Sequence, residues 1–137
     1  MYKKGIKNFF PVPNCLFDLG LSYGEIAVYI YLMYCENRIT NKCHPSYTTI
    51  GNKLGLGKVT VKKYVDMLCG KDLIYVQPTQ ITKKDGRKLN GNLEYTIRPI
   101  QEAIDSYYER QMRELERVQK EQLLKQRMLE YERIKSI

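Results

Sequence analysis

The chain has 137 residues, of which 43% are hydrophobic and 28% charged, which is typical of a soluble globular protein with one domain or one domain plus an appendage. The 23 Lys and Arg residues exceed the 15 Asp and Glu residues by eight, and the whole excess lies in residues 1–100, which hold 15 basic and 7 acidic residues. A surface with this charge attracts polyanions, with nucleic acid the first candidate and an anionic membrane the second. The longest apolar run has ten residues, which argues against a membrane span, and the N-terminus lacks the apolar core of a secretory signal.

The first predicted helix follows the S-x-x-E pattern of Ser22 and Glu25, in which each side chain can bond a free amide of the first turn. Residues 23–36 are apolar nearly all round, so we expect this helix to be buried on several sides, including against the C-terminal segment or a second copy. The tyrosines in and near this region are predicted to be core residues: Tyr23, Tyr31, Tyr34 and Tyr64.

A helix-turn-helix is predicted next. Ser46 is placed as the N-cap of a short helix over residues 47–54, and a glycine-containing turn over 55–57 ends that helix. A third helix runs from Lys58 to about Cys69, with apolar residues at helical spacing on one side. Two short helices joined by a three-residue turn that contains glycine are typical of a helix-turn-helix.

Two strands, over residues 73–76 and 93–97, flank a basic segment over 83–92 that contains Asp-Gly and Asn-Gly turn dipeptides. We expect a β-hairpin with a positively charged tip. A hairpin directly after a helix-turn-helix makes a winged helix, so the predicted fold class is α+β, mainly α, with a long C-terminal helical extension.

Residues 101–137 contain no Gly or Pro and hold eight basic and eight acidic residues, which predicts one long neutral helix. Its apolar seam is interrupted and changes register, so a sustained coiled coil is not expected. We therefore predict a DNA-binding domain over residues 1–100 and a helix over 101–137 for dimerisation or partner docking. The predicted homodimer uses this helix together with the first one.

The candidate DNA contacts lie on three elements. On the third helix Lys62 and Lys63 can reach guanine edges or phosphates, Val59 can touch a thymine methyl, and Lys58 with a helix-start amide can hold a phosphate. The other candidates are hydroxyls that start the second helix and basic residues of the hairpin: Ser46, Thr48, Thr49, Thr60, Lys83, Lys84, Arg87 and Lys88. The alternatives are a solvated helix face, a solubilising loop and, favoured for Ser46, simple N-capping.

The sequence gives little support for a metal site or a catalytic function. The four cysteines lack the paired spacing of a zinc site, and free thiols suit a cytoplasmic protein. His44 is the single histidine, and we interpret it as a loop residue before Pro45. No nucleotide-binding or hydrolase motif is present. We predict no enzyme activity, no metal, no cofactor, no membrane association and no small-molecule ligand.

The stretches VPNCLFDLGLSYGEIAVYIYLMYCENR and HPSYTTIGNKLGLGKVTVKKYVDMLCGKDLI resemble the N-terminal winged-helix domain of Gram-positive plasmid replication initiators and of their short helix-turn-helix relatives. The resemblance covers roughly residues 9–98. It rests on the VP-x-x-LF opening, the capped aromatic first helix, the Pro-Ser start of helix two, and the Thr-Val and Leu-Ile pairs at 60–61 and 73–74. Two positions depart from the pattern, because Gly57 replaces the usual serine and Asp72 the usual glycine.

The resemblance implies that the third helix enters the major groove, on Lys58, Thr60, Lys62 and Lys63. It also implies a cytoplasmic, sequence-specific binder of double-stranded DNA from a plasmid or other mobile element, acting as a repressor, a segregation adaptor, or an accessory factor at a replication or transfer origin. The alternative is a winged-helix protein-interaction module in a replication or transcription assembly.

Overall fold

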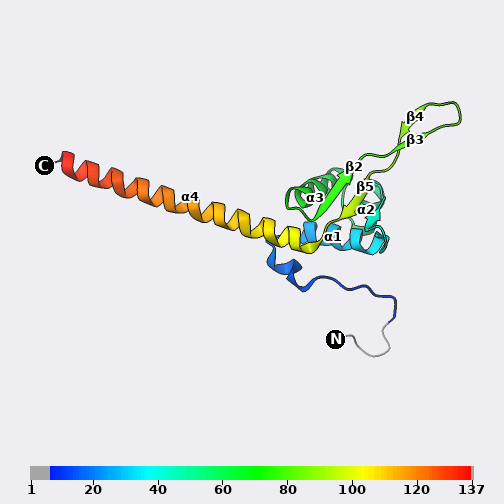
Figure 1. Cartoon of the computed structure of the whole chain (residues 1–137), viewed down its shortest axis with the longest axis horizontal. Coiled ribbons are helices and arrows are strands. Elements are labelled where there is room, and N and C mark those ends of the chain that lie inside the picture. The colour runs from blue at the N-terminus through cyan, green and yellow to red at the C-terminus, as the bar shows by residue number, and fades with distance from the viewer. Residues whose placement is uncertain (1–6, 137) are drawn as a thin grey trace.

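The computed structural model describes residues 7–136, so the first six residues of the predicted domain and Ile137 lie outside the described residues. The elements, in chain order, are η1 (Asn14–Asp18), α1 (Tyr23–Cys35), β1 (Lys42–Cys43), α2 (Tyr47–Leu54), α3 (Lys58–Gly70), β2 (Ile74–Gln77), β3 (Gln80–Thr82), β4 (Lys88–Asn90), β5 (Glu94–Ile97) and α4 (Ile100–Lys135). A small body carries two projections in opposite directions, the β3–β4 ribbon and α4 (Figure 1). The predicted fold class, a mainly helical winged helix-turn-helix with a long C-terminal helix, is confirmed.

The capping box of α1 forms as predicted. The Ser22 hydroxyl accepts a hydrogen bond from the Glu25 amide, and the Glu25 carboxylate accepts one from the Ser22 amide. Glu25 is 1% exposed, and Lys71, at the end of α3, donates to both carboxylate oxygens at 2.8 and 3.0 Å. This buried ion pair joins the start of α1 to the end of α3.

The core prediction for the tyrosines of α1 is partly wrong. Tyr23 is 84% and Tyr34 66% exposed, whereas Tyr31 and Tyr64 are half-buried. Tyr23 stands at the exposed first position of the helix, and Tyr34 lies on its outer face, where its ring is 6.0 Å from that of Phe10. Apolar periodicity does not separate the sides of a helix this rich in aromatic residues, because the residues on both sides are hydrophobic.

The helix-turn-helix depends on two glycines. Gly55 adopts a left-handed φ of 70°, which ends α2. The turn then folds back so closely that a Cβ on Gly51 would lie 2.4 Å from the carbonyl oxygen of Leu56. Gly57 is the N-cap of α3 and supplies no side-chain cap.

The sheet orders its strands β1-β5-β2, all antiparallel, with Ile74 opposite Ile97 and Val76 opposite Tyr95. The β2–β5 hairpin was predicted; β1 and the separate β3–β4 ribbon were not. The ribbon continues the hairpin beyond Pro78, so the wing reaches further from the body than a short tip loop would (Figure 1).

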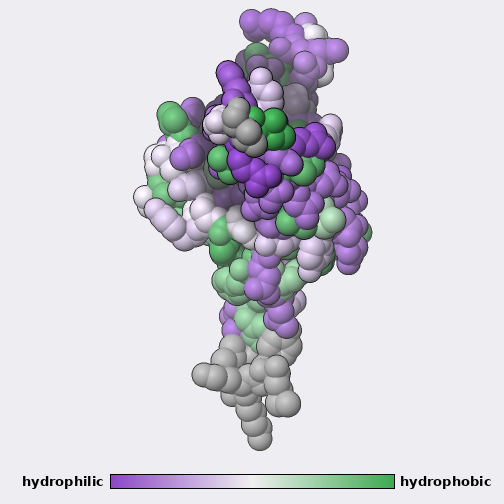
Figure 2. Space-filling view, turned by 90° about the vertical axis from the view of Figure 1, so that its left-hand side faces the viewer, coloured by the Kyte–Doolittle hydropathy of each residue, from purple (hydrophilic) through white to green (hydrophobic). Residues whose placement is uncertain are grey.

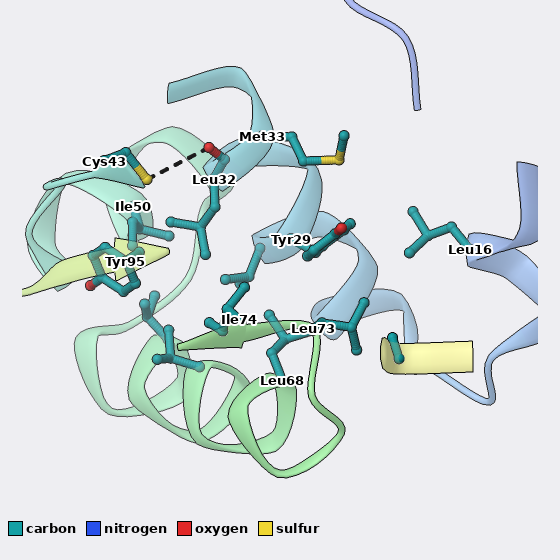
Figure 3. Close-up of a cluster of buried hydrophobic side chains, with 14 of the residues drawn as sticks. Leu16, Tyr29, Leu32, Met33, Cys43, Ile50, Leu68, Leu73, Ile74 and Tyr95 are labelled. Atoms are coloured by element: carbon teal, nitrogen blue, oxygen red, sulfur yellow. Dashed lines mark hydrogen bonds between the residues drawn. The ribbon is translucent and has the colours of Figure 1, made fainter. Parts of the chain in front are cut away.

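The core lies between α1, α3 and the sheet (Figure 3). Buried side chains of α1, α2, α3, β2 and β5 meet there, among them Leu32, Ile50, Leu68, Ile74 and Tyr95. Full burial of such side chains contributes about 1.5–3 kcal/mol each. This core fixes the angle between α2 and α3, and with it the surface that α3 presents.

Helix α4 begins on the body and then leaves it. Ala103 is buried, and the Tyr107 ring packs closely against Gly20. From Tyr108 onward nearly all side chains are exposed, and this part of α4 projects from the body as a rod (Figure 1). Its 36 residues correspond to roughly 54 Å.

Candidate nucleic-acid interface

Helix α3 presents a basic and apolar outer face. Val61, Val65 and Leu68 are buried, which turns Val59, 84% exposed, and the adjacent Lys62 and Lys63 to solvent. A shallow hollow on this face is lined by Val59, Lys62, Lys63, Asp66 and Met67. Lys58 is also exposed, whereas Thr60 is half-buried on the flank.

The two outward lysines differ in their surroundings. Lys62 donates to the Asp66 carboxylate at 2.9 Å, and this hydrogen bond raises the pKa of Lys62. Lys63 lies 5.9 Å from the centre of the Tyr64 ring. An incoming phosphate must therefore compete with Asp66 for Lys62, whereas the Lys63 ammonium forms no ion pair within residues 7–136.

The start of α2 is less available than the sequence indicated. The Ser46 hydroxyl accepts the Thr49 amide at 3.0 Å and lies 2.9 Å from the Thr49 hydroxyl. The N-capping interpretation of Ser46 is thus confirmed, and both hydroxyls already have partners. Thr48 is exposed beside them.

A cleft brings three of the predicted residues together with the base of the wing. It is lined by Ser46, Tyr47, Thr48, Lys58, Gly91, Asn92, Leu93 and Tyr95. Residues from the start of α2, from α3, from the chain before β5 and from β5 itself therefore surround one space.

Tyr95 is a residue of this cleft that the sequence did not single out. It is fully buried, its hydroxyl has no hydrogen-bond partner among the described residues, and burial raises its pKa. The hydroxyl therefore remains a neutral donor, and a buried donor without a partner is costly unless water or a ligand supplies an acceptor. Alternation on β5 predicts that Tyr95 points inward, but nothing in the sequence predicts a missing partner.

The wing tip carries the remaining predicted residues, and all four are exposed: Lys83, Lys84, Arg87 and Lys88. Arg87 donates to Asp85 at 2.7 Å, and hydrogen bonds from the Arg87 amide and guanidinium lower the pKa of Asp85. The three lysines form no ion pair within the part of the chain that the structure describes. Figure 2 shows the wing end of the molecule as a largely hydrophilic surface.

The ribbon also holds an apolar pair that the sequence analysis did not identify. Ile81 on β3 faces Leu89 on β4, and the two side chains are 58% and 44% exposed. The tip and the cleft lie at opposite ends of the wing (Figure 1). The predicted DNA-contact residues therefore form two separate groups. One group lies on α2, α3 and the wing base, and the other lies at the wing tip.

Other kinds of site are not found in the described part of the chain. Residues 7–136 contain no cluster of three His, Cys, Asp or Glu side chains that could hold a metal ion. No helix among them is both long and apolar enough to cross a membrane. The cysteines at 15, 35, 43 and 69 are free thiols.

Two comparisons with known proteins found a similar sequence family or structure, and one found no match. No curated protein sequence matches the chain. A solved structure described as a possible transcriptional regulator from Methanosarcina mazei Go1 is similar, with 21% sequence identity and a TM-score of 0.42 over 72% of this chain and 80% of that chain. Residues 19–74 match a family described as a helix-turn-helix domain. That match runs through α1, α2 and α3 to the first residue of β2, so this segment is similar in sequence to known helix-turn-helix domains.

Proposed function

We propose that this protein is a non-enzymatic, sequence-specific binder of double-stranded DNA. The observation that carries the proposal is the cleft in which α2, α3 and the wing base meet beside the exposed basic face of α3. Helix-turn-helix proteins dock α3 in the major groove and hold the adjacent backbone with the start of α2.

In this proposal the α3 face reads bases. Lys62 and Lys63 reach guanine edges, and Val59 contacts a thymine methyl group. The cleft holds a backbone phosphate, which accepts a hydrogen bond from the ammonium of Lys58 and, once the cleft opens enough to expose the buried hydroxyl, one from Tyr95. The wing tip lies along the adjacent backbone or minor groove and adds affinity without reading sequence.

The wider role rests on the resemblance of residues 9–98 to plasmid initiator domains. We propose a regulator of a plasmid or other mobile element, acting in transcription, replication, segregation or transfer. Copies associate as a homodimer through α4 and through α1, whose Tyr23 and Tyr34 side chains are exposed.

Fluorescence anisotropy tests the proposal, with duplexes tiling the region around the protein's own gene and a scrambled duplex, at about 50 and 200 mM salt. We expect one tile to bind at least a hundredfold tighter than the scrambled duplex at the higher salt. Equal, weak binding to every duplex that collapses with salt would refute sequence specificity. It would favour the alternative, a protein-interaction module.

Variants locate the interface. The double substitution Lys62→Ala and Lys63→Ala should weaken the best tile by at least tenfold and reduce the discrimination against scrambled DNA. The pair Lys120→Ala and Lys125→Ala removes the same charge from α4 and should change little. If the two double variants lost equal affinity, the assignment of α3 as the recognition helix would be wrong.

Tyr95→Phe isolates the phosphate cleft. Because it removes only the hydroxyl that lacks a partner, thermal stability should hold or rise. Affinity for every duplex should fall by roughly tenfold to a hundredfold, since a hydrogen bond to a charged group contributes about 1.5–3 kcal/mol. An unchanged affinity would show that the Tyr95 hydroxyl does not contact the DNA.

A further inference from the structure

Two hollows on the projecting part of α4 have the same apolar make-up and opposite charge. The proximal hollow, nearer the body, is lined by Asp105, Tyr108, Glu109, Met112 and Arg113. The distal hollow is lined by Arg127, Met128, Tyr131, Glu132 and Lys135. Each therefore has one tyrosine and one methionine, with two acids and one base in the first and two bases and one acid in the second.

The apolar side chains of both hollows are open to solvent. Tyr108 and Met112 are 63% and 57% exposed, and Met128 and Tyr131 are 57% and 66% exposed. Solvated apolar side chains in pairs, rimmed by charged residues, are typical of association surfaces. No described residue of the same chain covers either hollow.

The charge difference extends over the whole helix. Residues 101–119 hold five acidic and three basic residues, whereas residues 120–137 hold five basic and three acidic ones. In the proximal hollow Arg113 is already engaged by Glu109 at 3.9 Å, which leaves the Asp105 carboxylate with a neutral donor, Gln101. In the distal hollow neither Arg127 nor Lys135 forms an ion pair within the described residues.

We infer that the distal hollow of one copy docks on the proximal hollow of a second copy. The match is of charge and of apolar surface together: tyrosine and methionine side chains pack across the contact, and the Arg127 and Lys135 side chains face Asp105 and Glu109. Contact between two proximal hollows would instead oppose like charges. The inference deepens the dimer of the proposed function and rests on it only for the role of α4 in association.

The positions of the hollows determine what this contact builds. Sixteen residues separate Met112 from Met128, and at roughly 100° per residue the two side chains lie roughly 160° apart around the helix. One partner helix cannot cover both sides. A dimer made by one such contact therefore leaves one proximal and one distal hollow open, and further copies can add head to tail.

Charge reversal tests the contact in the full-length protein by sedimentation velocity and equilibrium at micromolar concentrations. One variant carries Asp105→Lys and Glu109→Lys, and the other Arg127→Glu and Lys135→Glu. Each alone should self-associate at least tenfold more weakly than the parent, because like charges then face each other. An equimolar mixture should recover association, and so should a chain with all four substitutions.

Several results would overturn the inference. Parent-like association of either reversed variant alone, or no recovery on mixing, would exclude the hollows as the contact. A mass fixed at twice 16.2 kDa at every concentration would exclude head-to-tail growth. The control Lys120→Glu with Lys125→Glu makes the same charge change as the distal variant, but outside both hollows, and should associate like the parent. Circular dichroism verifies that α4 stays helical in each variant.

The experiment is independent of the DNA-binding proposal. Reversal within α4 should leave the affinity of a monomer for a duplex with a single half-site unchanged, since α3 and the wing are intact. Conversely, the Lys62→Ala, Lys63→Ala variant should sediment like the parent. Loss of DNA binding with normal association would refute the proposed function alone, and the opposite result would refute the hollow-to-hollow contact alone.

Discussion

Replacing Gly51 with alanine should damage the helix-turn-helix more than its size suggests. The Cβ atom would lie 2.4 Å from the carbonyl oxygen of Leu56 and 3.6 Å from a methyl group of Val61. Ordinary contact begins near 3.4 Å, so the backbone of the turn would have to move by about 1 Å. That backbone is held by the amides of Gly55 and Leu56, which both donate to the Gly51 carbonyl.

The expected loss can be worked out from these contacts. Overpacking costs about 1–3 kcal/mol, and each of the two hydrogen bonds that the shift weakens contributes about 1 kcal/mol. Alanine's higher helix propensity returns about 1 kcal/mol. The net result is a destabilisation of about 2 kcal/mol, or a decrease in Tm of roughly 10 °C for a domain of this size.

Gly70→Ala is the matched control. Gly70 is the last residue of α3, and nothing lies within 4 Å of its added Cβ, so the change should be neutral or stabilise by up to about 1 kcal/mol. Thermal and urea denaturation of both variants measure the difference. Because the turn sets the angle of α3, Gly51→Ala should also weaken DNA binding. Equal stability of the two variants would refute the close approach as the reason for glycine at this position.

Three further substitutions test other parts of the structure. Asp72 has a left-handed φ of 62° and its carboxylate accepts a hydrogen bond from Arg98 at 3.0 Å. Asp72→Gly relieves the backbone strain but removes this partly exposed ion pair, so the two effects should offset and leave Tm nearly unchanged, and a clear loss in thermal denaturation would contradict this. Asp66→Asn should free Lys62 and tighten DNA binding severalfold at low salt, because it removes a negative charge that competes with the phosphates. Unchanged or weaker binding in anisotropy would argue against Lys62 as a contact. Burial raises the pKa of Glu25, but hydrogen bonds donated by Lys71 and by the amide and hydroxyl of Ser22 outweigh it and hold the pKa below its usual value. The pair therefore stabilises the fold above about pH 4.3 and stops doing so as the pH falls through the folded-state pKa. Lys71→Met should lower the free energy of unfolding by about 2–3 kcal/mol at pH 7, which is less than the loss of a fully buried pair because Lys71 is partly exposed. At low pH the denaturation curves of the variant and the parent should converge. A loss of stability that does not depend on pH would exclude the ion pair as its cause.

The elements with local signals were predicted closely. Ser22 and Ser46 cap their helices because an N-cap depends on residues three apart in the chain. The left-handed Gly55 likewise ends α2 where the sequence placed the turn. The left-handed φ of Asp72 is not predicted by its residue type. It explains why the family that the sequence resembles has a glycine at this position, because glycine adopts this conformation easily.

What depends on contacts between distant residues could not be predicted. The pairing of Lys71 with Glu25 spans 46 residues, and the cleft at Tyr95 needs α2, α3 and the wing base to be placed together. The wing also extends further than its turn dipeptides indicate, because β3 and β4 pair beyond the break at Pro78. None of these features leaves a periodic pattern in the sequence.

The two proposed functions, DNA binding and self-association, lie on different projections of the molecule. The charge excess lies in residues 1–100, which include α3 and the wing, whereas residues 101–137 are neutral overall but divided into an acidic and a basic half. A uniformly basic α4 would bind DNA along its length and repel its copies, because like charges would face each other in every register. A helix that is neutral overall, with its acidic and basic residues in separate halves, avoids both binding to DNA along its length and repulsion between copies. Because the wing and α4 leave the body in opposite directions, copies can associate through α4 while every α3 and wing remains open to DNA (Figure 1).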